Sequence, residues 1–223
     1  MGDKIPLLSD DFCHYKFIDR IYSNIMMQKT HICLDKGSEM IYVADFLSER
    51  KSKEVYHSLE NEISWKKEKI KLFGKEYWQP RLLAWYADKG LNYNYSGIDH
   101  EPLEWTETLL FLKNMIEEQT GYFFNSVLAN LYRDGQDSMG WHSDDEKELG
   151  KAPVIASLSL GAVRRFCFRP KKGIEATKME LLLDSGSLLI MKGETQQNFQ
   201  HALPKTAKKI SSRINLTFRQ ILK

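Results

Sequence analysis

Three side chains in this sequence are of the types that hold a redox metal. His142 and Asp144 lie two residues apart, and His201 follows much later in the chain. Two imidazoles and one carboxylate can form a facial triad, which binds Fe(II) on one side and leaves positions open for a co-substrate and O2. If His142 and Asp144 share a β-strand, both side chains point to the same face, because side chains alternate along a strand. We therefore predict that these three residues bind the metal and form the catalytic centre.

A second pattern lies close to the C-terminus, in the alternating run Arg213–Arg219. One face of a strand with this sequence is apolar, and the other carries two guanidinium groups, an amide and a hydroxyl. The polar face could simply be solvated, as in many antiparallel sheets. It could instead bind a dicarboxylate, because a guanidinium group captures a carboxylate with paired hydrogen bonds. In that interpretation Arg213 and Arg219 supply the charge, and Asn130 and Tyr132 approach from the strand before the triad.

Length and composition limit the possible classes of protein. The chain has 223 residues, of which 42% are hydrophobic, and no apolar run is as long as a membrane span. Its start, Met1–Pro6, lacks the apolar core of a signal peptide, and its three cysteines are widely separated. We expect one soluble, intracellular, monomeric globular unit without disulfides, cytoplasmic in a bacterium and nuclear in a eukaryote.

The net charge of +2 is small, but the basic residues are unevenly placed. If folding brings the basic clusters to one face, they form an electrostatic footprint for phosphates. Three ordinary solvated surfaces are the alternative. The clusters are Lys66, Lys67, Lys69, Lys71 and Lys75; Arg164, Arg165, Arg169, Lys171 and Lys172; and Lys205, Lys208 and Lys209.

Helical patterns come early in the chain and strand patterns late. Asp45 is placed to cap a helix that runs through Ile63, and a second helix is expected from about Leu103 to Thr120, ended by Gly121. Many short strands joined by tight turns are typical of a sandwich or barrel. The β-rich runs are Ser126–Tyr132, Val154–Leu160, Arg165–Phe168, Met179–Leu183 and Ser187–Met191, followed by Arg213–Arg219.

Several motifs together resemble a known family. They are Asn130–Tyr132, His142–Asp144, His201 and Arg213–Arg219, with Phe73–Lys75, Pro80–Arg81, Tyr93–Gly97, Asp144–Glu146 and His201–Pro204. This pattern resembles the AlkB family of Fe(II)/2-oxoglutarate dioxygenases, in particular the nucleic-acid demethylases of the mammalian AlkB-homologue type. The likeness begins near Lys71 and runs to the end.

The resemblance implies a mainly β fold with flanking helices. It would be a double-stranded β-helix, or jelly roll, with an N-terminal helical and substrate-binding extension. We expect an N-terminal extension over residues 1–40 and a single dioxygenase domain over 41–223. Within that domain, the nucleotide-recognition segment would cover about 71–100 and the jelly-roll core about 124–223.

The resemblance also implies roles for individual residues. His142, Asp144 and His201 match the Fe(II) ligands. The matches to 2-oxoglutarate contacts are Asn130, Tyr132, Arg213, Asn215, Thr217 and Arg219. The matches to substrate-binding positions are Phe73, Gly74, Lys75, Tyr93, Asn94, Tyr95, Asp145 and Glu146.

Some of these substrate residues have a simpler interpretation. Phe73, which matches a finger that fills the space left by a flipped base, could instead pack in the core. Tyr95, which with His142 would clamp the base, could be an ordinary packing aromatic. Asp145 could cap a helix, and Glu146 could be an exposed carboxylate at a helix start.

The implied activity is oxidative demethylation of 1-methyladenine and 3-methylcytosine. The substrate would be DNA, duplex or single-stranded, with RNA as an alternative, and the cofactors Fe(II), 2-oxoglutarate and O2. The products would be the repaired base, formaldehyde, succinate and CO2. Duplex DNA is favoured by Phe73–Lys75. Two other functions stay open: hydroxylation of a protein, lipid or small molecule, and a non-catalytic jelly-roll binding module.

Overall fold

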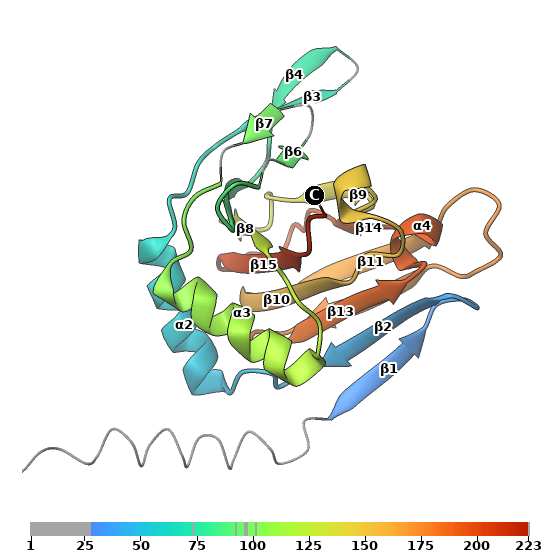
Figure 1. The fold of residues 1–223 in the computed structure, drawn as a ribbon, viewed down its shortest axis with the longest axis horizontal. Helices are drawn as coiled ribbons and strands as arrows, with labels where there is room; N and C mark the ends of the chain where they lie inside the picture. The colour runs from blue at the N-terminus through green and yellow to red at the C-terminus, as the bar shows by residue number, and fades with distance from the viewer. Residues whose placement is uncertain (1–27, 73, 92, 96–97, 101, 223) are drawn as a thin grey trace, which may run out of the picture.

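The computed structural model describes residues 28–222 except 73, 92, 96, 97 and 101, and it is built around two antiparallel sheets (Figure 1). The large sheet has the order β1-β2-β13-β10-β15-β8-β5, and the small sheet the order β12-β11-β14-β9. The large-sheet strands are β1 (Lys29–Cys33), β2 (Ser38–Val43), β5 (Leu82–Ala87), β8 (Ser126–Tyr132), β10 (Ile155–Gly161), β13 (Leu188–Gly193) and β15 (Arg213–Arg219). The small-sheet strands are β9 (Met139–His142), β11 (Arg164–Pro170), β12 (Met179–Leu183) and β14 (Phe199–Leu203).

One hydrophobic cluster lies between the two sheets. Leu83 and Leu128 from the large sheet share it with Phe168 and Phe199 from the small sheet, and all four side chains are buried. Two antiparallel sheets that pack face to face around such a cluster form a jelly roll. The fold class expected from the sequence is confirmed.

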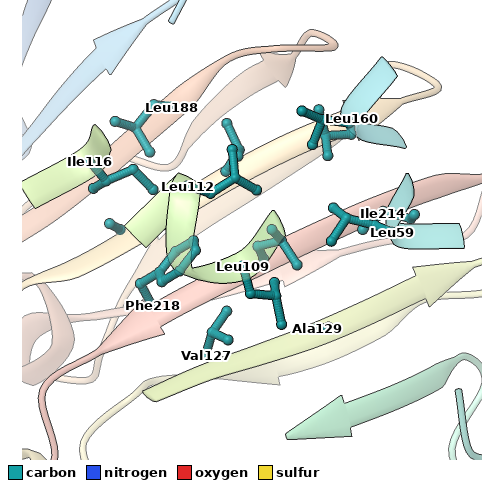
Figure 2. Close-up of a cluster of buried hydrophobic side chains, with 14 of the residues drawn as sticks. Leu59, Leu109, Leu112, Ile116, Val127, Ala129, Leu160, Leu188, Ile214 and Phe218 are labelled. Carbon is teal, nitrogen blue, oxygen red and sulfur yellow. The ribbon is translucent and has the colours of Figure 1, made fainter. Parts of the chain in front are cut away.

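A second cluster lies on the outer face of the large sheet, under two helices. These are α2 (Glu49–Glu62) and α3 (Glu107–Thr120), which lie side by side across the sheet (Figure 1). Leu109, Leu112 and Ile116 recur at three- and four-residue spacing along α3, so they share one face and pack on Val127 and Phe218 (Figure 2). This face of α3 therefore belongs to the hydrophobic core.

The helix starts differ from the sequence-based expectation. Ser48, and not Asp45, caps α2, since its side chain accepts a hydrogen bond from the backbone N–H of Lys51. Thr106 caps α3 in the same way, so that helix begins four residues after Leu103. The expected end is confirmed: Gly121 follows α3 with a φ of 74°, a left-handed conformation that glycine adopts without strain.

The large sheet begins earlier in the chain than expected. β1 pairs with β2, and β2 pairs with β13, so residues 29–43 belong to the same sheet as β10 and β15. The expected boundary between residues 40 and 41 falls inside β2. β5 also pairs with β8, so the sheet includes residues well before 124.

Two small hairpins lie beyond the ends of the sheets. β3 (Lys69–Leu72) pairs with β4 (Lys75–Trp78), and β6 (Tyr93–Tyr95) with β7 (Ile98–His100). Figure 1 shows the β3–β4 hairpin extending away from the body of the molecule. Two short helical turns, η1 (Lys147–Leu149) and α4 (Thr195–Asn198), connect strands of the core. Within the described part of the chain, no helix has both the length and the apolar character needed to span a membrane.

Candidate metal and co-substrate site

The predicted triad comes together at one edge of the small sheet. β9 and β14 are neighbours, and their register places His142 opposite His201, with ring centroids 4.2 Å apart. Ligand atoms of His142, Asp144 and His201 all lie within 4.8 Å of one another. The structural reason differs from the one expected, because β9 ends at His142 and Asp144 lies in the loop that follows. The two histidines are therefore brought together by the pairing of β9 with β14, and Asp144 joins them from the loop after β9.

Asp144 is held by two contacts inside the protein. Its backbone N–H donates to Oε1 of Gln196 at 3.0 Å, and Nη2 of Arg219 donates to its Oδ1 at 2.7 Å. Burial alone would raise the pKa of this carboxyl, but the charge and hydrogen bond of Arg219 hold the pKa at about 2. Asp144 is therefore an anion at neutral pH, and one oxygen is oriented by an arginine.

The two histidines are set up as neutral ligands. Nδ1 of His142 lies 2.9 Å from the carbonyl oxygen of Gly140, so this nitrogen carries the proton and Nε2 keeps its lone pair. Burial lowers the pKa of His142, and burial together with the neighbouring imidazole lowers the pKa of His201 to about 3. Two neutral imidazoles and a carboxylate are the donor set that suits Fe(II).

The floor of the cavity is made by β8, β10 and β15 of the large sheet. Side chains two residues apart share a face, so Arg213, Asn215, Thr217 and Arg219 all line the cavity. The apolar residues between them pack under the helices instead. Both faces of β15 are buried, which rules out a polar face in water.

A hydrogen-bond network fixes the polar floor. Nδ2 of Asn215 donates to Oγ1 of Thr217 at 2.9 Å, and Oγ of Ser157 donates to Oδ1 of Asn215 at 3.2 Å. On β8, Oδ1 of Asn130 accepts from Nε of Arg81 at 2.7 Å. Buried and fully oriented polar groups of this kind form a rigid surface for a polar ligand.

The guanidinium of Arg213, which lines the cavity, is only partly hydrogen-bonded by the described residues. It is 1% exposed, and its Nη2 donates to Oγ of Ser159 at 2.9 Å and to Oδ1 of Asn215. Its Nε and Nη1 have no hydrogen-bond partner among the described residues. Burial lowers its pKa to about 10, so it remains a cation at neutral pH. A buried cation with free donors is costly unless an anion binds, and a ligand carboxylate would supply one.

Arg164 was expected in an exposed basic cluster, and this expectation is wrong. Its side chain is 3% exposed, and its guanidinium donates to the backbone carbonyls of Asp134, Asp137 and Pro204 at 3.2, 2.9 and 2.8 Å. These carbonyls belong to the loop before β9 and the loop after β14. Arg164 therefore ties together the chain segments that carry the two histidines.

The comparisons with known proteins agree with this geometry. The family model described as the 2OG-Fe(II) oxygenase superfamily matches residues 39–219. The mouse protein named DNA oxidative demethylase ALKBH2 is 38% identical over 179 residues, covering 75% of this chain and 74% of the mouse protein. The chain belongs to the AlkB family of 2OG-Fe(II) oxygenases. Fe(II), 2-oxoglutarate and O2 are the cofactors of this family, and the cavity contains groups suited to the first two.

Other AlkB relatives extend the comparison. The bovine protein named alkB homolog 3 is 45% identical over 200 residues, covering 86% of this chain. This chain spans 66% of that bovine protein's length. The solved structure of OsALKBH1 has a TM-score of 0.60 at 15% identity and covers 86% of this chain, which shows a shared fold.

The substrate positions expected from the AlkB resemblance lie on the hairpins. Phe73 lies outside the described residues. Gly74 forms the turn between β3 and β4 with a φ of 78°, and Lys75 begins β4; both are exposed. Tyr93, Asn94 and Tyr95 form β6, but the placement of their side chains lies outside the description. Their proposed contacts with a base therefore stay predictions.

Two further substrate positions follow the triad. Asp145 is exposed and its Oδ2 accepts from Nζ of Lys171 at 2.8 Å. Glu146 is half-buried and precedes η1 without making a capping hydrogen bond through its side chain. Asp145 lies one residue further from η1, and no hydrogen bond from its side chain to that turn is observed; Glu146 does stand at the start of η1, as its simpler interpretation expected, but it is half-buried and not exposed.

Sequence reasoning missed several residues that shape the site. Ser157 and Ser159 alternate with buried aliphatic residues on β10, and this period of two could have revealed them. Arg81 lay in a recognised motif but was given no role. Gln196, on the short α4, carries no sequence signal that we can identify. The apolar wall of the cavity comes from Leu128, Met139, Phe166, Met191 and Leu203.

Proposed function

We propose that this chain is an Fe(II)/2-oxoglutarate-dependent oxidative demethylase of N-methylated bases in nucleic acid. The expected substrates are 1-methyladenine and 3-methylcytosine in DNA, with RNA as a further substrate, and the products are the repaired base, formaldehyde, succinate and CO2. The observation that carries the proposal is that one cavity contains the His142, Asp144 and His201 triad beside a buried Arg213 guanidinium whose Nε and Nη1 have no hydrogen-bond partner among the described residues. The printed name of the mouse relative at 38% identity, DNA oxidative demethylase ALKBH2, supports the choice of nucleic acid, and that of the bovine relative at 45% identity supports a 2-oxoglutarate-dependent dioxygenase.

The triad would hold Fe(II) through two neutral imidazoles and one carboxylate. When bound, Fe(II) and 2-oxoglutarate supply the oxidising power with which O2 hydroxylates an N-methyl carbon. The resulting hydroxymethyl group on nitrogen breaks down to formaldehyde and the unmethylated base. The protein contributes by keeping Asp144 ionised, the histidines unprotonated and the ligand atoms close together.

The two arginines of β15 would have different roles. Arg219 is already paired with Asp144, so we assign it to orienting that ligand. Arg213 keeps two free donors in the cavity, so we assign it to the distal carboxylate of 2-oxoglutarate. Tyr132, whose ring lies 5.3 Å from the Arg213 guanidinium carbon, limits the movement of that side chain. Asn130, Asn215 and Thr217 would supply the remaining polar contacts.

The rest of the cavity would protect the reaction from water. Apolar side chains from both sheets, including Leu128, Phe166 and Met191, line the space next to the triad. A dry cavity strengthens the charge contacts of Asp144 and Arg213 and limits side reactions. The methylated base would enter from the side of the β3–β4 and β6–β7 hairpins.

The proposal is tested by incubating the protein with Fe(II), 2-oxoglutarate and oligonucleotides that carry 1-methyladenine or 3-methylcytosine. We expect formaldehyde release and an oligonucleotide mass lower by one methylene group. Asp144→Ala, which removes a ligand, is expected to give neither product. If wild-type protein binds metal and 2-oxoglutarate but leaves both lesions unchanged, the demethylase proposal is wrong; succinate formation with another substrate would then favour hydroxylation of a protein, lipid or small molecule.

We also propose that the protein acts as a monomer inside the cell. Light scattering of the purified chain tests the first point, and fluorescence microscopy of a tagged chain tests the second. A stable dimer in solution would contradict the monomer.

A further inference from the structure

The β3–β4 hairpin carries two large aromatic side chains that have little packing. Tyr77 is 50% exposed and Trp78 is 55% exposed, and all four residues of β4 are exposed. A two-stranded ribbon without a core behind it gains little stability from these rings. Tyr77 and Trp78 are consecutive in β4, so their side chains point to opposite faces of the ribbon, and each exposed ring is available to a ligand.

Two lysines contact the Trp78 ring. Nζ of Lys67 lies 5.1 Å from the ring centroid, and Nζ of Lys69 lies 5.2 Å from it. Lys69 also pairs with Glu76 at 2.8 Å, so part of its charge is compensated. Residues 66–78 nevertheless contain five lysines and only two glutamates, which leaves the segment cationic. An aromatic ring beside cationic groups has the chemistry to receive a base and its phosphate.

The hairpin is anchored next to the candidate active site. The backbone N–H of Gln79 donates to the carbonyl of Glu68 at 2.9 Å and closes the base of the hairpin. Arg81 then donates to Asn130, which lines the metal cavity, at 2.7 Å. Trp78 is three residues from Arg81, at most about 10 Å of extended chain, so the base of the hairpin is tethered to a residue that contacts the cavity lining. A strand with one base in the cavity would have neighbouring nucleotides within reach of the hairpin.

We propose that Trp78, with Lys67 and Lys69, forms a second nucleotide subsite outside the metal cavity. An unpaired base stacks on the exposed indole, and the adjacent phosphate lies between the two ammonium groups. The base must be unpaired, because a base inside a duplex is already stacked on its neighbours. This inference rests on the proposed function for the identity of the ligand as nucleic acid, but binding at this subsite needs neither metal nor 2-oxoglutarate.

The protein offers a matched control for this subsite. Phe111 on α3 is 46% exposed and has Nζ of Lys51 5.1 Å from its ring centroid. It is therefore a similar aromatic–lysine pair, but it lies in the helical layer on the outer face of the large sheet (Figure 1). A general preference of nucleic acid for such pairs would affect both positions equally.

The test measures binding of an unmodified, fluorescently labelled single-stranded oligonucleotide to the full chain by anisotropy, without Fe(II) or 2-oxoglutarate. Trp78→Ala is expected to weaken binding about tenfold, the effect of losing one stacked base, and Trp78→Phe to restore most of it. Phe111→Ala is expected to bind like wild type. Lys67→Gln with Lys69→Gln should reduce the salt dependence of binding.

Two results would overturn the subsite. One is equal binding by wild type and Trp78→Ala; the other is an equal loss in Phe111→Ala. A dimer in sedimentation that Trp78→Ala converts to monomer would also overturn it, since the surface would then bind a second copy. The catalytic proposal fails separately: if wild type shows no demethylation while Trp78→Ala still weakens binding, the subsite stands without that activity.

Discussion

Arg213 and Arg164 are two buried arginines beside the ring of Tyr132, and replacing each by methionine should change the stability of the protein by very different amounts. Their guanidinium carbons lie 5.3 and 5.8 Å from the ring centroid of Tyr132. Arg213 has two nitrogens without partners among the described residues, whereas Arg164 donates to three backbone carbonyls. We therefore expect Arg164→Met to lose much more stability than Arg213→Met, which should be nearly neutral or stabilising.

The magnitudes follow from these contacts. Replacing a poorly compensated buried charge by an apolar side chain is neutral or stabilising by about 1–4 kcal/mol. Arg213→Met also removes the donor to Ser159 and Asn215, which costs about 1 kcal/mol. The metal-free variant should thus lie between about 1 kcal/mol less stable and about 3 kcal/mol more stable than wild type. Arg164→Met leaves three carbonyls unsatisfied and should lose about 3–5 kcal/mol.

The affinity for 2-oxoglutarate gives a second test of the role of Arg213. Removing the partner of a buried carboxylate costs about 2–5 kcal/mol, so Arg213→Met should bind 2-oxoglutarate roughly 30- to 5,000-fold more weakly. Urea unfolding measures stability, and calorimetric titration of the Mn(II)-loaded protein with 2-oxoglutarate measures affinity. Wild-type affinity in Arg213→Met, or a loss of more than about 2 kcal/mol in its stability, would refute the role assigned to the free donors of Arg213.

Three further predictions concern the metal ligands and a nearby loop. Asp144→Ala leaves Arg219 without its carboxylate, so the metal-free variant should lose about 3–5 kcal/mol in urea unfolding; wild-type stability would mean that this pair is unimportant. The pKa of His201 is lowered from 6.5 to about 3 in the folded protein, so the unfolded chain binds a proton that the folded chain does not. The metal-free protein should therefore lose stability as the pH falls below 6.5. His201→Asn should flatten this dependence when melting temperatures are measured across a range of pH. Gly135→Ala would place its Cβ 2.6 Å from the carbonyl oxygen of Thr206, so we expect a loss of about 1–3 kcal/mol, and an unchanged melting temperature would contradict the close packing of these loops.

The sequence predicted the strands that have a regular side-chain period. The bounds of β8, β12 and β15 are those expected from the hydrophobic pattern. The alternation of polar and apolar residues in β15 also predicted that its polar side chains share one face. It could not show whether that face is exposed to water or covered by a second sheet. That outcome depends on which strands pack opposite, a long-range property that a local pattern does not contain.

The missed helix start has a long-range cause as well. Asp45 and Ser48 are both good capping residues, and local propensity does not choose between them. In the structure the backbone N–H of Leu47 donates to the carbonyl of Gly186, in a turn far along the chain. Residues 44–47 form a turn and a bend held by this contact, so α2 begins at Glu49, later than the sequence suggests.

The sequence predicted which residues form the metal site, but not the contacts that hold them in place. His142, Asp144 and His201 were identified from residue type and spacing, although Asp144 reaches the site from a loop. Arg164 was misassigned because clusters of charge in a sequence do not show which side chains point inward. Its alternation with Phe166, which faces the core, would have indicated burial.

The central claim is that one cavity couples 2-oxoglutarate turnover to removal of a methyl group from a base. The most direct measurement is mass spectrometry of a single-lesion 1-methyladenine oligonucleotide, with succinate and formaldehyde counted in the same reaction. We predict one succinate and one formaldehyde for each oligonucleotide that loses its methyl group, and no products with Asp144→Ala. An unchanged oligonucleotide in the presence of bound metal and 2-oxoglutarate would contradict the claim.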